Sequence, residues 1–249
     1  MSMKSENYYK HKEMPQNSIY YVNASLSCMD LGNIEKGMHE INHSRIHGLH
    51  YDIVDGVFNS CFIFGDQMLK VFRRYTALPI IVHLACQNPI PYIKPCITNG
   101  ADYIAVHYEA EADLLSVFQM IRELGGKPIL AFRCDTSVPH NFIDIAAQAE
   151  WILKLSVHPG FSGQVFQKEA LSHIAEMHQL LTAAGIDKRI EVDGNISTAT
   201  IQECAIAGAT MFTGGTSGLF HPLHTLDESI ELLEQAISFG GNSYGINDE

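Results

Sequence analysis

Two histidines and two aspartates occupy positions where metal-ligand chemistry is expected. His50 and Asp52 lie one residue apart near the end of an apolar run, His83 lies near the end of the next run, and Asp193 ends a later one. In a strand, residues two apart point to the same face, so His50 and Asp52 are expected side by side. Two imidazoles and two carboxylates suit Zn²⁺, Fe(II), Mn²⁺ or Co²⁺ better than Ca²⁺ or Mg²⁺, which prefer oxygen ligands. We therefore predict one divalent metal ion held by these four residues, its identity being open.

The two aspartates also suit proton transfer. If Asp52 and Asp193 approach a substrate from opposite sides, one carboxylate removes a proton from carbon and the other delivers one to the opposite face. Such an exchange inverts the carbon. A single His or Asp at a strand end more often caps a helix or binds a loop, so the joint placement of the four residues is what favours chemistry.

Short apolar runs alternate with segments of helical period throughout the chain, as in a parallel sheet covered by helices. Eight such units in 249 residues, without a break in composition, predict a single (β/α)8 barrel, although a doubly wound open sheet has the same alternation. We expect the barrel over residues 17–239, with flexible ends at 1–16 and 240–249. The predicted strands are Ile19–Ala24, Leu49–Asp52, Ile80–Leu84, Tyr103–His107, Pro128–Phe132, Ile152–Val157, Arg189–Asp193 and Met211–Gly214.

Three glycine-containing segments, at residues 159–164, 194–195 and 214–217, follow the last three predicted strands. Glycine lets the backbone approach a phosphate closely, and the loops after the last two strands of such barrels frequently bind one. We therefore predict a sugar phosphate as substrate, with its reacting carbon over the metal. The substrate-binding residues expected in these loops are Gly160, Phe161, Ser162, Gly163, Gln164, Gly194, Asn195, Gly215, Thr216 and Ser217.

Composition excludes several classes of partner. A formal net charge of -12 argues against nucleic acid and anionic membranes, which both need a basic face. We find no uncharged apolar stretch of about 18 residues that could span a bilayer. Six cysteines without a Cys-x-x-Cys pair indicate reduced thiols, and hence a cytoplasmic protein. A homo-oligomer is expected because closed symmetric assemblies are common among soluble proteins.

Seven strings occur in order along the chain: Ser25–Leu31, His50–Gly56, Val82–Leu84, Val106–Glu109, Pro159–Gln164, Glu191–Gly194 and Gly215–Phe220. Through these strings the chain, from about Tyr20 to Leu233, resembles the ribulose-phosphate 3-epimerase family and its relative, allulose-6-phosphate 3-epimerase. The resemblance implies that His50, Asp52, His83 and Asp193 bind the metal and that Asp52 and Asp193 form the acid/base pair. It also implies that Ser25 lies near the substrate, and His83 is expected there as well. Among the seven strings, Gly215–Phe220 and the Cys28–Leu31 part of the first are more similar to the allulose-6-phosphate branch.

Several positions depart from the family pattern. Val54, Ala85 and Leu155 stand where the family usually has methionines around the reacting carbon, so shape and dielectric are expected to differ there. Further departures are Asn59–Cys61 and His158 in binding loops, Lys154 at an apolar strand position, and Arg133–Asp135 in place of Asn-Pro. The four ligand positions are intact, so the departures bear on the substrate more than on the reaction.

We interpret the chain as a metal-dependent 3-epimerase that acts through an enediolate. The candidate pairs are D-ribulose 5-phosphate with D-xylulose 5-phosphate, and D-allulose 6-phosphate with D-fructose 6-phosphate. Two alternatives are a sugar-phosphate lyase on the same barrel and a catalytically altered sugar-phosphate binder, the second suggested by the missing methionines. Opposed carboxylates favour two-sided proton transfer over both. His107 and Glu109 are expected either to line the pocket or to hydrogen-bond the ligands.

Overall fold

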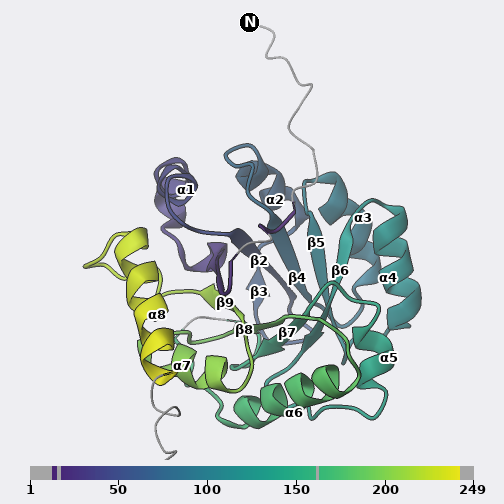
Figure 1. Cartoon of the computed structure of the whole chain (residues 1–249). Helices are drawn as coiled ribbons and strands as arrows, with labels where there is room; N and C mark the ends of the chain where they lie inside the picture. Colours follow the sequence, from purple (N-terminus) through teal and green to yellow (C-terminus); the bar gives the residue numbers. More distant parts are fainter. Residues whose placement is uncertain (1–12, 16–17, 161–162, 242–249) are drawn as a thin grey trace, which may run out of the picture.

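Eight parallel strands close into a ring in the computed structural model, which describes residues 13–15, 18–160 and 163–241 (Figure 1). β1 pairs with β2 on one side and with β9 on the other. This closure excludes the open sheet and confirms the predicted (β/α)8 barrel. In ring order the strands are β1 Tyr21–Ser25, β2 Gly48–Asp55, β4 Ile80–Ala85, β5 Tyr103–His107, β6 Lys127–Phe132, β7 Ile152–Leu155, β8 Ile190–Asp193 and β9 Met211–Gly214.

Helices follow the barrel strands and cover the outside of the ring (Figure 1). They are α1 Ile34–Asn42, α2 Asp66–Arg73, α3 Ile90–Thr98, α4 Leu114–Glu123, α5 Phe142–Ala146, α6 Glu169–Ala183, α7 Thr198–Ile206 and α8 Leu226–Gly241, with short 3-10 turns at Leu26–Cys28 and Leu31–Asn33. The Ser197 side chain accepts a hydrogen bond from the Thr200 N–H and so caps the first turn of α7. Within the described residues, no helix combines the length and apolar character needed to cross a bilayer.

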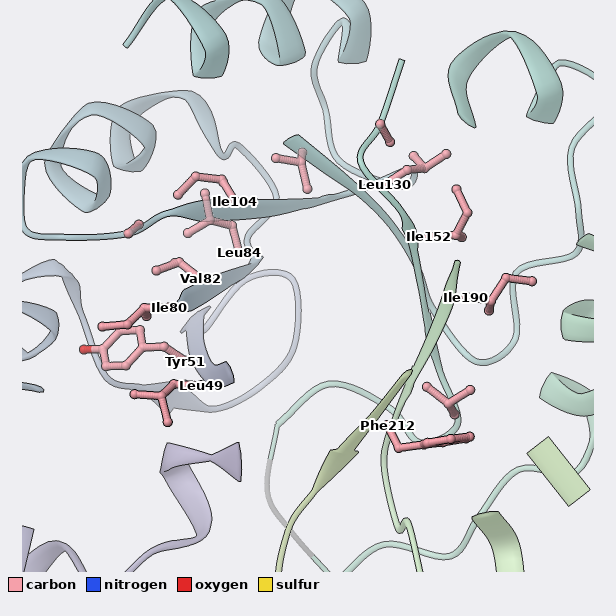
Figure 2. Packing of buried hydrophobic residues seen from close by; sticks show 14 of the residues in the cluster. Leu49, Tyr51, Ile80, Val82, Leu84, Ile104, Leu130, Ile152, Ile190 and Phe212 are labelled. Carbon is pink, nitrogen blue, oxygen red and sulfur yellow. The ribbon is translucent and has the colours of Figure 1, made fainter. Parts of the chain in front are cut away.

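Alternation along each strand separates an outer core from the barrel interior. In β2, Leu49 and Tyr51 face the helices, whereas His50 and Asp52 face inward. Figure 2 shows this outer core, in which Leu49 and Tyr51 lie beside Ile80, Val82 and Leu84 of β4. The amino-terminal end of the barrel is filled by apolar side chains, which leaves the opposite end for polar groups; these apolar residues include Tyr21, Ile81, Tyr103, Trp151 and Met211.

The chain ends differ in part from the expected flexible segments. Met14 belongs to the interior apolar cluster, is only 8% exposed, and its N–H donates to the Tyr103 hydroxyl. At the other end, α8 continues to Gly241, two residues into the predicted tail. The rest of both predicted segments, residues 1–12, 16 and 242–249, lies outside the described residues, where flexibility stays a prediction.

The predicted end of β2 at Asp52 was wrong by three residues. β2 continues to Asp55 because it forms a short antiparallel ladder with β3, Phe62–Ile63, which the sequence patterns did not predict. The Asp55 carboxylate then accepts the N–H groups of Val57 and Phe58 and closes the turn. The site residues His50 and Asp52 are therefore held in the middle of a strand rather than at its frayed end.

Lys154 of β7 is a fully buried lysine on the helix-facing side of the barrel. Its ammonium donates to the carbonyl oxygens of Arg133 and Thr136, at 2.6 and 2.7 Å. Burial lowers the Lys154 pKa to about 8, although nearby acidic groups oppose the shift. The lysine therefore ties the loop after β6 to β7, at the cost of burying a charge.

We expect Lys154→Met to change how stability depends on pH. The folded chain holds the Lys154 proton up to a pKa of about 8, whereas the unfolded chain holds it up to the ordinary 10.5. Unfolding between these values takes up a proton, so raising the pH stabilises the folded state. In urea titrations, the unchanged protein should gain free energy of unfolding relative to Lys154→Met as the pH rises through this range. A difference that does not change with pH would contradict this prediction, and Lys94→Met, at an exposed lysine, is the control variant.

Candidate active site

The four predicted ligands meet at the carboxyl-end mouth of the barrel. Strand register sets Asp52 opposite His83, and the His83 Nδ1 lies 3.0 Å from Asp52 Oδ1. His50 Nε2 lies 3.1 Å from the same oxygen and 3.5 Å from Asp193 Oδ2. One ligand atom from each of the four residues lies within 4.8 Å of all the others. Three strands, β2, β4 and β8, thus bring together side chains that are far apart in the sequence.

Burial makes the charges of this cluster interact strongly. Burial alone lowers the pKa of His50, but the Asp52 and Asp193 carboxylates outweigh it and raise that pKa to about 10. Burial raises the pKa of Asp193 to about 6, with His50 opposing the shift and Asp52 adding to it. Burial also raises the Asp52 pKa, yet contacts with His50 and His83 hold it below its ordinary value. The two carboxylates therefore attract positive charge to the space between them.

The donor set fits a divalent cation. His50 Nε2 and His83 Nδ1 both face carboxylate oxygens, so each imidazole can offer a lone pair toward the same point. A proton on His50 brings one positive charge to two carboxylates, whereas a divalent cation brings two and leaves both imidazoles neutral. Mixed nitrogen and oxygen donors match Zn²⁺, Fe(II), Mn²⁺ or Co²⁺.

A cavity that is open to solvent lies above this cluster. His50 is fully buried beneath the cavity rather than on its wall, and Phe161 and Ser162 lie outside the described residues. All other predicted site residues line the cavity, namely Ser25, Asp52, His83, Gly160, Gly163, Gln164, Asp193, Gly194, Asn195, Gly215, Thr216 and Ser217.

The loops after β7 and β8 are fastened to each other beside the cavity. Asn195 Nδ2 donates to the Gln164 carbonyl oxygen at 2.9 Å, and the Gln164 side chain donates to the carbonyl oxygen of His158. Gly194 has φ +118°, and a Cβ there would lie 2.6 Å from Val157 Cγ2. Only glycine fits this close approach, which keeps backbone groups of both loops near one end of the cavity.

Sequence reasoning missed Ser27 as a site residue. The Ser27 hydroxyl donates to Asp52 Oδ2 at 3.1 Å, and the Ser25 hydroxyl lies 3.5 Å from the same oxygen. Both serines thus hold the carboxylate oxygen that does not face the imidazoles. Strand alternation gave no signal for Ser27, because it lies in the 3-10 turn that follows β1.

His107 and Glu109 lie behind His83 and do not line the cavity in the described structure. His107 Nε2 is 2.8 Å from His83 Nε2, and His107 Nδ1 is 2.9 Å from Glu109 Oε2. Burial lowers the pKa of His107 to about 4, so its ring is neutral near pH 7. Burial raises the pKa of Glu109, but the hydrogen bond from His107 outweighs it and lowers that pKa to about 2. Of the two expected roles, the structure favours hydrogen bonding to a ligand.

Cys134, Asp135 and His158 form a second group of ligand-type side chains, between the loops after β6 and β7. Cys134 Sγ lies 3.6 Å from His158 Nδ1. The Arg133 guanidinium lies 3.4 Å from Asp135 Oδ1, and the Lys154 ammonium binds carbonyl oxygens on both sides of the Cys134–Asp135 pair. Two cations beside this group oppose a third, so the electrostatics favour the first cluster as the metal site.

Comparison with known proteins agrees with this geometry. The family model described as the ribulose-phosphate 3 epimerase family matches residues 21–220. The chain belongs to the ribulose-phosphate 3-epimerase family. As a member it is an isomerase of the carbohydrate-phosphate epimerase class. The resemblance inferred from the sequence strings is therefore confirmed.

Curated relatives in this family cover most of the chain. The ribulose-phosphate 3-epimerase of Aquifex aeolicus is 35% identical over 69% of this chain and 77% of its own length. The enzyme of Chlamydia pneumoniae is 31% identical over 80% of this chain and 84% of its own length. The enzyme of Escherichia coli K12 is 34% identical over 68% of this chain and 75% of its own length. The matches thus extend over the barrel and are not confined to a short motif.

Solved structures support the fold. Phosphoribosyl anthranilate isomerase from Thermococcus kodakaraensis superposes with a TM-score of 0.60 at 12% identity, covering 88% of this chain and 99% of the other. The tryptophan synthase A-subunit from Pyrococcus furiosus superposes with a TM-score of 0.58 at 13% identity, covering 88% of this chain and 96% of the other. At such low identity, the likeness to these structures supports the barrel fold and nothing about function.

We expect an added divalent metal ion to stabilise the folded protein, because the ion would bind to the His/Asp cluster. At a free concentration of about one hundred times its Kd, a ligand that binds only the folded state adds about 2.7 kcal/mol to the free energy of unfolding. For a chain of this size, that corresponds to a rise in Tm of roughly 5 to 10 °C. We expect Zn²⁺ added to chelator-treated protein to produce such a shift, and His83→Asn to remove most of it. Calorimetry checks this, with exposed His140→Asn as control. An unchanged shift in His83→Asn would place the metal elsewhere.

Proposed function

We propose that this family member inverts carbon 3 of a phosphorylated ketose by proton transfer between Asp52 and Asp193. One observation carries the proposal: the two aspartates come from β2 and β8, which β1 and β9 separate in the ring, yet both line one cavity. A substrate between them would present opposite faces to the two carboxylates. Inversion by proton transfer between two carboxylates requires this arrangement.

Charge stabilisation is the main demand of the reaction, because a carboxylate is a weak base toward a carbon-bound proton. A divalent cation held by His50, Asp52, His83 and Asp193 supplies, when bound, positive charge next to the substrate oxygens that become negative. Ser25 and Ser27 orient Asp52 through its second oxygen. The apolar side chains of Val54 and Leu155 line the same cavity and strengthen electrostatic interactions by excluding water.

The proposed proton transfers balance without a further reactant. One carboxylate takes the proton from carbon 3, and the electron pair of the broken C–H bond enters the C2–C3 double bond of an enediolate. The other aspartate, protonated, then gives its proton to carbon 3 from the opposite face. The two aspartates exchange protonation states in each turnover, so the reverse reaction begins at the other carboxylate.

The glycine-rich loops support a phosphate at one end of the cavity. Gly160, Gly194 and Gly215 line it, and each lies in the loop that follows one of the last three barrel strands. Backbone N–H groups there can bind a phosphate despite the acidic net charge of the chain. We propose a sugar phosphate bound with its phosphate in these loops and its carbon 3 over the His/Asp cluster.

Two chain lengths are candidates for the substrate. The relatives are named ribulose-phosphate 3-epimerases, which makes D-ribulose 5-phosphate the first compound to test. Allulose 6-phosphate is the second, because Cys28–Leu31 and Gly215–Phe220 resemble that branch. These strings meet at the cavity, since a Cβ on Gly215 would lie 2.9 Å from Cys28 Sγ. The expected homo-oligomeric state and cytoplasmic location stay predictions.

Proton NMR in heavy water tests the proposed chemistry. We expect metal-loaded protein to remove the C3 proton signal of D-ribulose 5-phosphate, D-allulose 6-phosphate or both, and the sugar exchanged faster identifies the preferred chain length. Asp52→Asn and Asp193→Asn should each slow net epimerisation by at least about 100-fold, because each removes one acid/base group. Asp187→Asn, at an exposed aspartate, is the matched control.

Other outcomes of the same experiment would overturn the proposal. Full exchange in both Asn variants would remove the assigned roles. Cleavage of a carbon–carbon bond in the added sugar would favour the lyase. Tight binding of both sugars without exchange or turnover would favour the binder.

A further inference from the structure

We propose that the two metal-binding imidazoles are each fixed in one tautomer by a hydrogen-bond relay that ends on a buried carboxylate, Glu109 for His83 and Glu191 for His50. This inference rests on the proposed four-residue metal site and assigns positioning roles to residues outside it. The two relays run in opposite directions from the metal position, through β5 and through β9 and β8.

The first relay begins at His83. A neutral imidazole has one N–H donor and one nitrogen lone pair. His83 Nδ1 faces the metal position beside Asp52, so this nitrogen must offer the lone pair and Nε2 must carry the proton. His83 Nε2 lies 2.8 Å from His107 Nε2, which must then accept. The His107 proton is consequently on Nδ1, 2.9 Å from Glu109 Oε2.

Glu109 gives this relay its direction because a carboxylate can only accept. Its other oxygen, Oε1, accepts the Arg133 backbone N–H at 2.9 Å, so the carboxylate is held from two sides. His107 is fully buried, and the Phe58 ring packs on it with centroids 4.7 Å apart. Burial and this aromatic contact restrict rotation of the His107 ring, which would exchange its two nitrogens.

The second relay begins at His50, whose Nε2 faces Asp52 and Asp193. His50 Nδ1 lies 3.3 Å from Thr213 Oγ1, which lies 2.8 Å from Glu191 Oε1. The Thr213 hydroxyl donates its proton to the Glu191 carboxylate, because an ionised carboxylate can only accept. A lone pair on Thr213 Oγ1 therefore accepts a hydrogen bond from the N–H at His50 Nδ1.

Glu191 is itself fixed inside the barrel. It is fully buried, and it accepts hydrogen bonds from Asn23 Nδ2 at 2.8 Å and from Trp151 Nε1 at 2.7 Å. Three donors thus hold a carboxylate that is far from solvent. The sequence already carried a signal for it, since Glu191 lies two residues before Asp193 and alternation turns both inward.

The relays explain why the two histidines present different nitrogens, Nε2 from His50 and Nδ1 from His83. They also make both imidazoles better ligands, because a hydrogen bond toward a carboxylate raises the basicity of the opposite nitrogen. Removing such a partner typically costs about 10- to 100-fold in metal affinity.

Glu109→Gln and Thr213→Val separate the two relays. The glutamine amide can donate to His107 Nδ1 and reverse the first relay, and valine has the shape of threonine without the hydroxyl. We expect each variant to weaken Zn²⁺ binding about 10- to 100-fold in competition with a chromophoric chelator. Glu111→Gln, two residues beyond Glu109 and exposed, should bind Zn²⁺ as the unchanged protein does.

Long-range ¹H–¹⁵N NMR of histidine-labelled, Zn²⁺-loaded unchanged protein gives a second readout that does not depend on any variant folding. We expect protonated Nε2 in His83 and protonated Nδ1 in His107 and His50. The opposite tautomer in His83 or His50 would overturn the relays, as would unchanged Zn²⁺ affinity in both Glu109→Gln and Thr213→Val. If the unchanged protein bound no Zn²⁺, the proposed metal site itself would fail, and the relays with it.

Discussion

Two partly buried carboxylates beside two buried imidazoles set the main constraint on this molecule. Asp52 and Asp193 share His50 as a neighbour, whose Nε2 lies 3.1 Å from an Asp52 oxygen and 3.5 Å from an Asp193 oxygen. The ligand oxygens of the two aspartates lie within 4.8 Å of each other, and two negative charges this close need a compensating cation. Against the effect of burial, the two carboxylates raise the pKa of His50 to about 10, and burial raises that of Asp193 to about 6. A divalent cation meets the same demand while leaving both imidazoles free to bind it.

The barrel satisfies this constraint by assigning different tasks to its two ends. The amino-terminal end is apolar and is closed by Tyr21, Tyr103 and Met14. Above it, Glu191 is buried but fully engaged by Asn23, Trp151 and Thr213, and this layer supports the ring of His50. The ligands and the glycine-rich loops come last, at the carboxyl ends of the strands. Each layer thus fixes the position of the next, which suits a site that must hold a substrate between two carboxylates.

Much of this arrangement follows from short-range rules. Alternation pairs His50 with Asp52, and the strand-end rule for barrels selects His83, Asp193 and the glycine-rich loops. The remainder depends on how distant strands are aligned. The contact of Thr213 with His50 needs the register of β9, β1 and β2, and no local pattern specifies it. Likewise, β3 consists of two residues, too few for a periodic signal, and Lys154 breaks the apolar pattern of β7 because its partners are carbonyl oxygens of another loop.

The most direct test of the central claim is a crystal structure with Mn²⁺ and a stable analogue of the enediolate, the metal being located by anomalous scattering. The proposed mechanism predicts one strong peak among His50 Nε2, His83 Nδ1 and the carboxylates of Asp52 and Asp193, with carbon 3 of the analogue between the two carboxylates. A metal bound only at Cys134, Asp135 and His158, or an analogue with both aspartates on the same face of carbon 3, would contradict it.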